Sequence, residues 1–321
     1  MIIEKKFVNL RSRLVRAYSV GTLTPPSGAP VTNPYHTATG IIHLSIFMEA
    51  KKVLFVSQQV SPYVPETPMS ENGRIIPQNI HSKEFEVRLF TPKYGCINER
   101  RNQLHEVIRL SGLNLVIDDA DHPLIIKVAT LLPSRMQVYF IDNDDYFHPA
   151  VEKELETDSY PEDNDERVMF FTMGVIETVK KLRWTPSFIQ CDGWVSALTP
   201  LYIRRKYHDD PTFRSSKIIY ALTPEQFDGT LDARFVEKLL MDTFVPGDIA
   251  ALGEGPVDWL TLNKLAIDYA DAIVMTREDL PQELVDYAVA AGKPILRDVD
   301  AEDKDAFKDF YRSLSDDDED F

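Results

Sequence analysis

The 321-residue chain is long enough for one large α/β domain or two smaller ones, and 44% hydrophobic with 27% charged residues is a globular composition. Its 51 acidic residues against 35 Lys and Arg give a net charge of -16, which argues against nucleic-acid and membrane partners because such a surface repels phosphate groups. Two cysteines and no metal-ligand spacing among seven histidines exclude a disulfide framework and a structural zinc site, and favour a reducing, cytoplasmic location.

Residues 1–47 differ in composition from the rest of the chain. They carry five Lys or Arg and a single acid, and residues 22–40 are rich in Pro, Thr, Ser and Gly with no steady period. We interpret residues 1–47 as a disordered extension. Such a basic leader can be a targeting peptide. We prefer a non-native extension ahead of a start at Met48, where MEAKKVLFVS resembles the beginning of a domain.

From Met48 to about residue 300, short apolar runs alternate with helical patterns. The runs are rich in β-branched residues and predict strands at 52–57, 87–91, 123–129, 136–142, 187–191, 217–222 and 272–276. This alternation predicts an α/β fold, a Rossmann-like doubly wound and mostly parallel sheet with helices on both faces.

Two helices are especially clear. Over 164–183, apolar residues recur at three- and four-residue steps, and Asp163 with Glu166 predicts a capping box at its start. Near the C-terminus, apolar residues at 307, 310, 311 and 314 predict a helix that docks one face on the domain, followed by a solvated acidic tail. We therefore divide the chain into residues 1–47, a domain at 48–300, and a helix with its tail at 301–321.

The carboxyl ends of the strands are where a doubly wound sheet binds ligands. The segment from Ser57 to Gln78 follows the first strand and reads as a proline-shaped loop that presents Tyr63 to a neutral ligand, or to none, because its prolines offer no N–H to an anion. In QCDGWV (190–195), Asp192 is a general base or a helix cap, and Trp194 stacks on a sugar or packs in the core. For both we favour the structural alternative, and Cys191 is expected to be a core thiol.

Other candidates for chemistry are few. No phosphate-binding glycine motif or metalloprotease motif occurs. Asp142, Asp144 and Asp145 lack the glycine turn of a calcium loop, so turn and helix-start roles are expected instead. Arg277 and Glu278 stand at the end of the strand 272–276. We predict no metal and no cofactor.

From about Lys51 to Glu283 the chain resembles the N-terminal half of bacterial glycogen synthases and plant starch synthases, glycosyltransferase family 5. The shared elements are KVLFVS (52–57), the Pro62–Tyr63 pair, Pro77, RLFTPKYG (88–95), VYFIDNDDYF (138–147), DNDERVMFF (163–171) and the segments 186–194 and 262–276. The resemblance implies one half of a GT-B fold. It also implies transfer of glucose from ADP-glucose to the end of an α-1,4-glucan, with the N-terminal half on the acceptor side.

Several residues depart from the family pattern. In the loop after the first strand, Gln59 replaces a glutamate, Pro65 a lysine, and Thr67 with Pro68 two glycines. The family's His-x-His-Asp-Trp turn becomes 190–194, in which Asp192 stands at a histidine position close to the transferred sugar and only Trp194 is kept. The family's Ile-His-Asn falls at 221–223. Loss of the lysine and the two glycines removes the groups that would meet the donor's phosphates, and all these losses together argue against ordinary synthase activity.

From this resemblance we expect a glycogen- or starch-synthase-like domain that lacks the donor domain and is inactive on its own. We expect Tyr63, Asp192 and Trp194 to bind substrate, and we assign no catalytic residue firmly. One alternative is the acceptor half of a transferase whose second chain supplies the donor domain. Another is a non-catalytic module that binds α-glucan or regulates its storage. Fold alone does not choose between them.

Overall fold

The computed structural model describes residues 50–147 and 162–316. The predictions for residues 1–47 and for the acidic tail from residue 317 concern segments outside these ranges. The strands are β1 (Lys51–Ser57), β2 (Phe85–Pro92), β3 (His105–Glu106), β4 (Leu113–Ile117), β5 (Ala120–Leu131), β6 (Met136–Asp142), β7 (Phe188–Asp192), β8 (Lys217–Ala221), β9 (Ala272–Met275) and β10 (Ile295–Arg297). The helices are α2 (Pro68–Ile80), α3 (Asp144–Phe147), α4 (Asn164–Leu182), η1 (Trp194–Ser196), α5 (Thr199–Arg205), α6 (Phe235–Met241), η2 (Pro246–Leu252), α7 (Trp259–Tyr269), α8 (Gln282–Ala290) and α9 (Lys304–Asp316).

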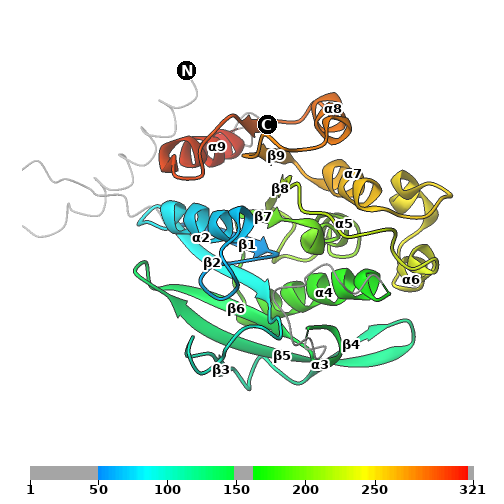
Figure 1. The fold of residues 1–321 in the computed structure, drawn as a ribbon, viewed down its shortest axis with the longest axis horizontal. Coiled ribbons are helices and arrows are strands. Elements are labelled where there is room, and N and C mark those ends of the chain that lie inside the picture. The colour runs from blue at the N-terminus through cyan, green and yellow to red at the C-terminus, as the bar shows by residue number, and fades with distance from the viewer. Residues whose placement is uncertain (1–49, 148–161, 317–321) are drawn as a thin grey trace, which may run out of the picture. The chain divides into compact units, whose positions relative to one another are not determined.

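A ten-stranded sheet runs through the described part of the chain in the order β10-β9-β8-β7-β1-β2-β6-β5-β3, with β4 paired to β5 (Figure 1). All pairs from β10 to β6 are parallel, whereas β5 pairs antiparallel with β6, β4 and β3. The predicted α/β fold with a mostly parallel sheet is confirmed, and each predicted strand is present. The short strands β3, β4 and β10 were not predicted.

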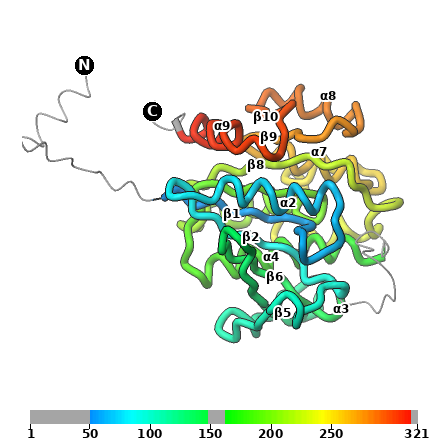
Figure 2. The backbone as a smooth tube through the Cα atoms, turned by 60° about the vertical axis from the view of Figure 1, so that its left-hand side comes forward, coloured from blue at the N-terminus to red at the C-terminus, as the bar shows by residue number. Residues whose placement is uncertain are grey.

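The alternation of side chains along β1 divides the core between the two faces of the sheet. Val53 and Phe55 point to the face that α2 and α9 cover, whereas Leu54 and Val56 point to the face covered by α4, α5 and α7. Figures 1 and 2 both show α9 beside α2. Because β1 is buried on both faces, its sequence is continuously apolar rather than alternating.

Helix α4 forms over the predicted residues, but the predicted capping box is wrong. Asp163 makes no side-chain cap hydrogen bond and instead pairs with Arg167 at 2.9 Å. Glu166 accepts from the Tyr146 hydroxyl at 2.7 Å and from Lys238 Nζ at 2.6 Å. A partner one helical turn away takes the Asp163 carboxylate, and partners distant in sequence take that of Glu166.

The segment after β1 also differs from the prediction of a loop reaching Gln78. The loop ends at Thr67, whose hydroxyl accepts from Ser70 N at 3.1 Å, while Ser70 Oγ accepts from Thr67 N at 2.9 Å. This reciprocal cap, with Pro68 in the first turn, starts α2 ten residues before the expected end of the loop. Pro77 lies inside the helix, and the reciprocal cap after Thr67 has no signal that the proline-rich sequence made visible.

Helix α9 forms at the predicted place and buries Phe307, Tyr311 and Leu314 on the sheet. Arg312 pairs with Glu84, whose carbonyl accepts from Lys51 N, and Lys51 and Ser315 line the same cavity. The two ends of the described region are therefore neighbours. No helix within residues 50–147 and 162–316 is long and apolar enough to cross a membrane.

Candidate functional site

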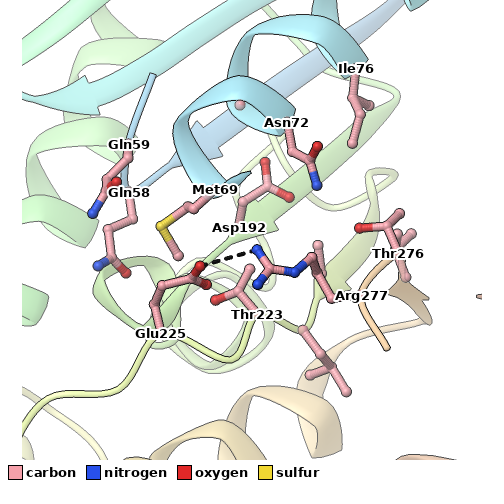
Figure 3. A pocket seen from close by; sticks show the side chains of 14 residues that line it. Gln58, Gln59, Met69, Asn72, Ile76, Asp192, Thr223, Glu225, Thr276 and Arg277 are labelled. Atoms are coloured by element: carbon pink, nitrogen blue, oxygen red, sulfur yellow. Dashed lines mark hydrogen bonds and ion pairs between the residues drawn. The ribbon is translucent and has the colours of Figure 1, made fainter. Parts of the chain in front are cut away.

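A pocket lies at the carboxyl ends of β1, β7, β8 and β9, beside the point between β1 and β7 where the strand order of the sheet reverses (Figure 3). Its volume is about 30 Å³. The walls are formed by the loop after β1, helix α2 and the residues that follow β7, β8 and β9; they are Gln58, Gln59, Met69, Asn72, Gly73, Ile76, Asp192, Ala221, Leu222, Thr223, Glu225, Val274, Thr276 and Arg277. This volume is far below the ~300–1,000 Å³ typical of ligand sites, so the pocket as it stands suits a small group better than a whole sugar.

Asp192 ends β7 directly beside Ser57, the last residue of β1. The Ser57 hydroxyl donates to Asp192 Oδ2 at 2.8 Å, and Gln190 Nε2 donates to Oδ1 at 2.9 Å. Burial raises the pKa of Asp192 to about 6, because desolvation of the charged form outweighs these two hydrogen bonds, which lower it. Asp192 does not cap a helix, since the 3-10 helix η1 begins after Gly193 with no side-chain cap.

The turn after β7 depends on Gly193. Its φ of 82° and ψ of 164° place it in a region that only glycine adopts readily. A Cβ at this position would lie 2.5 Å from Gln58 Oε1. Gln58 is itself fully buried, and its Nε2 has no partner in the described part of the chain. The absence of a Cβ at Gly193 therefore allows the turn to pack directly against the Gln58 side-chain amide, which lines the pocket.

Arg277 brings the positive charge of the pocket wall, and acidic side chains already occupy it. Its guanidinium donates twice to Asp279, at 2.9 and 2.6 Å, and once to Glu225 at 3.2 Å (Figure 3). The hydrogen bonds from Arg277 lower the pKa of Asp279 and keep it ionised. With Asp192 and Glu225 also lining the pocket, the wall carries more carboxylates than cations.

A wider, open depression of about 710 Å³ shares Thr276 and Arg277 with the pocket. It lies along α8 and the residues after β10; its polar lining also includes Glu278, Gln282, Arg297, Asp298 and Asp300. The volume falls within the ~300–1,000 Å³ typical of ligand sites. Its lining includes donors such as Arg297 and Gln282 and acceptors such as Asp298 and Asp300, which the hydroxyl groups of a sugar can use.

Two of the expected substrate-binding residues do not line the pocket. Tyr63 is 7% exposed and packs edge-on to Phe140 at 4.9 Å, and burial raises its pKa to about 12. Trp194 has no exposed surface and packs against Phe227 at 5.0 Å. Neither ring is open to a sugar in this conformation, so the packing alternative describes Trp194. Asp192 lines the pocket, and its binding role stays a prediction.

The remaining candidates also have clear places. Cys191 is fully buried, and burial raises its pKa far above the ordinary range, as a core thiol requires. Asp142 is buried and pairs with Lys127 at 2.7 Å, while Asp144 and Asp145 open α3. No cluster of three or more His, Cys, Asp or Glu that could hold a metal occurs in residues 50–147 and 162–316.

Sequence reasoning found Asp192 and Arg277 but missed Glu225, Gln58 and Gln190 as part of the site. Glu225 follows β8 by four residues, so the rule that ligands bind after strand ends could have found it. Gln58 follows β1 directly and was passed over inside the proline-rich segment. Gln190 lies within a strand, and nothing local indicates that its amide supports a carboxylate.

Comparison with known proteins agrees with this architecture. The family described as the starch synthase catalytic domain matches residues 52–294. The glycogen synthase of Pelodictyon phaeoclathratiforme is 32% identical over 235 residues, covering 73% of this chain and 47% of that protein. The glycogen synthase of Chlorobium luteolum is 36% identical over 193 residues, 59% of this chain and 39% of the relative. The chain thus spans about half the length of these relatives or less.

The fold has a counterpart among solved structures. The catalytic domain of starch synthase IV from Arabidopsis thaliana, solved with ADP and acarbose bound, superposes with a TM-score of 0.63 over 79% of this chain and 52% of that one, at 14% identity. This likeness shows that the sheet and its helices are those of one half of a GT-B enzyme. With three quarters of its length matched, the chain belongs to the starch synthase catalytic-domain family of glycosyltransferases.

Proposed function

We propose that this domain binds α-1,4-glucan on the acceptor side of a synthase-type site and does not by itself transfer glucose from ADP-glucose. The observation that carries the proposal is the character of the pocket at Asp192. Its volume of about 30 Å³ is small for a glucosyl ring, and Arg277 is already paired with the carboxylates of Glu225 and Asp279. A pyrophosphate brought here meets carboxylates before it meets an uncompensated cation.

Glucan binding is proposed from the family to which the chain belongs and from the open depression beside the pocket. A neutral polyhydroxyl chain can exchange hydrogen bonds with its polar side chains without the charge repulsion that an anion would meet beside Glu278, Asp298 and Asp300. Gln282 and Arg297 are exposed on its wall, where Gln282 Nε2 donates to Asp286 at 2.8 Å and Arg297 pairs with Asp298 at 3.6 Å. The net charge of -16 is likewise compatible with a neutral polymer and repels a nucleotide.

Three measurements on the full chain test the proposal. Retention on amylose resin should be clear for the wild type and weakened several-fold by Gln282→Ala combined with Arg297→Ala. The control is Arg214→Ala, which removes an exposed arginine outside the depression. Calorimetry with ADP-glucose at millimolar concentration should show no saturable binding. Transfer of radiolabelled glucose to glycogen should stay at background, with the Chlorobium luteolum glycogen synthase as the positive control.

The outcomes separate the candidate roles. Turnover by the purified chain would contradict the proposal and restore ordinary synthase activity. Turnover that requires a second purified chain would favour the two-chain transferase. Absence of glucan retention would remove the binding role.

A further inference from the structure

A chain of three hydrogen bonds joins the C-terminal helix to the pocket. The Tyr311 hydroxyl on α9 donates to Gln190 Oε1 at 2.6 Å. Gln190 Nε2 in turn donates to Asp192 Oδ1 at 2.9 Å, and Ser57 holds the other oxygen. Since an amide offers a carbonyl on one side and an NH₂ on the other, the bond from Tyr311 fixes the orientation in which Gln190 donates to Asp192.

Water does not substitute for these bonds, because Tyr311 and Gln190 are both 0% exposed. The Tyr311 ring lies between Phe188, at 5.0 Å, and Phe85, at 5.9 Å. The hydroxyl is therefore held in place by the docking of α9 as a whole. A buried hydrogen bond that fixes a neighbouring polar group acts through position, and its loss frees that group to rotate.

The network joins residues that depart from the family pattern to a helix outside the family match. By the resemblance described above, Gln190 and Asp192 stand at the positions of two histidines in the family's turn. Helix α9 begins at Lys304, beyond the matched residues 52–294. The helix outside the family match thus supports the two residues that depart from the family.

We propose that Tyr311 is a positioning residue that acts through Gln190 to hold the Asp192 carboxylate where it accepts a hydrogen bond from one hydroxyl group of a bound glucan. This proposal rests on the glucan-binding function proposed above. The pocket, about 30 Å³ in volume, suits a small group such as a hydroxyl, and the rest of the sugar lies in the depression that adjoins it at Thr276 and Arg277. Binding at the pocket then depends on α9 being docked.

The test measures the pKa of Asp192 directly, by carboxyl ¹³C NMR, in the full chain. Tyr311→Phe removes the hydroxyl and keeps the ring. It should weaken the bond from Gln190, and since that bond lowers the pKa of Asp192, the pKa should rise by about half a unit. Tyr287→Phe is the matched control, because it removes a tyrosine hydroxyl that donates to Asp268 on α7, away from this network. Ser57→Ala calibrates the loss of one donor.

The other ionisable groups around Asp192 do not obscure this reading. Cys191, Tyr220 on β8 and Tyr311 on α9 all have a pKa raised well above its ordinary value by burial, so they stay neutral across the titration. On the pocket wall, Glu225 and Arg277 form a pair with each other. A titration near pH 6 therefore reports on Asp192.

A shift with Ser57→Ala and none with Tyr311→Phe would overturn the proposal. Hydrogen exchange of the α9 amides shows whether the helix stays docked in each variant. If Tyr311→Phe releases α9, a second variant, Phe307→Leu, loosens the helix and keeps the Tyr311 hydroxyl. The pKa of Asp192 should then rise as the α9 amides exchange faster. A constant pKa would contradict the coupling between α9 and Asp192. Amylose retention should fall several-fold in Tyr311→Phe and remain unchanged in Tyr287→Phe. Wild-type protein that binds no glucan would remove the proposed function and leave the NMR result to decide the positioning role.

Discussion

Ser57 and Asp192 end two neighbouring parallel strands, β1 and β7, in register. The serine hydroxyl donates to the carboxylate at 2.8 Å, at the point where the strand order of the sheet reverses. Parallel strands meet at one edge with their carboxyl ends, which brings together residues 135 positions apart in the sequence. This pair therefore sets where the carboxylate of the pocket lies.

The stability of the protein should fall as pH rises from about 4 to 6. The folded state keeps the proton of Asp192 up to a pKa of about 6, whereas the unfolded chain releases it near about 3.9, so over this range folding binds a proton that unfolding releases. The full shift corresponds to about 3 kcal/mol, and the partial exposure of Asp192 reduces the expected effect to about 1–2 kcal/mol.

Urea unfolding at pH 4.5 and 7.5 checks this for the wild type and Asp192→Asn. The variant should lose that part of the pH dependence, while Glu254→Gln, which removes an exposed carboxylate, should retain it. Identical pH profiles for all three proteins would show that Asp192 titrates normally.

Gly193→Ala should destabilise the protein by more than about 3 kcal/mol, since strain at its backbone conformation adds to a clash with Gln58. Gly253 is the matched control: its φ of 68° and ψ of -164° lie in the same region, and a Cβ there meets nothing within 4 Å. Gly253→Ala should cost about 1–3 kcal/mol from backbone strain alone. Equal losses in chemical unfolding would mean that Gln58 moves aside.

Lys238→Met should cost about 3–5 kcal/mol of unfolding free energy, because it leaves two carboxylates without their cation. Lys238 is 5% exposed and contacts Asp165 at 2.7 Å and Glu166 at 2.6 Å. The exposed pair of Arg234 with Asp118 provides the comparison, and Arg234→Met should cost far less than Lys238→Met because solvent screens the exposed charges. The urea midpoint should fall much further for Lys238→Met than for Arg234→Met. Similar midpoints would contradict the argument that burial makes the Lys238 pairs the costlier ones to break.

Freeing Arg277 should create an anion site. In the double variant Glu225→Gln and Asp279→Asn, the guanidinium loses both ionic partners, and ADP affinity should rise about fivefold or more, since a surface charge pair contributes about 1 kcal/mol. Adding Arg277→Ala should abolish the gain. Calorimetry that finds no difference between the wild type and the double variant would show that pocket size, not charge, excludes the nucleotide.

The strands could be predicted because β-branched runs such as 52–57 and 272–276 carry their own signal, and buried parallel strands read as continuous apolar segments. The capping box at Asp163 failed because Arg167 and Lys238 compete for the same carboxylates, and one of these partners comes from another helix. Burial of Trp194 also has no local sign, since a tryptophan beside a turn suits a core or a sugar equally well.

The contact from Tyr311 to Gln190 spans 121 positions and joins a helix to the middle of the sheet. The periodicity of 307–314 predicts an apolar face but not the strand that this face meets. The site residues that lie at strand ends could therefore be predicted from the sequence. The site contacts that depend on how a helix docks on the sheet could not.

Because Lys51 and Ser315 border one cavity, the described region begins and ends at a single corner. A unit of this kind tolerates circular permutation. A short glycine-serine linker from residue 316 to residue 50, with new ends opened at the exposed turn beside Gly229, should yield a chain with the circular dichroism and the single cooperative unfolding transition of the parent. Loss of that transition would show that the native order of the elements is itself required.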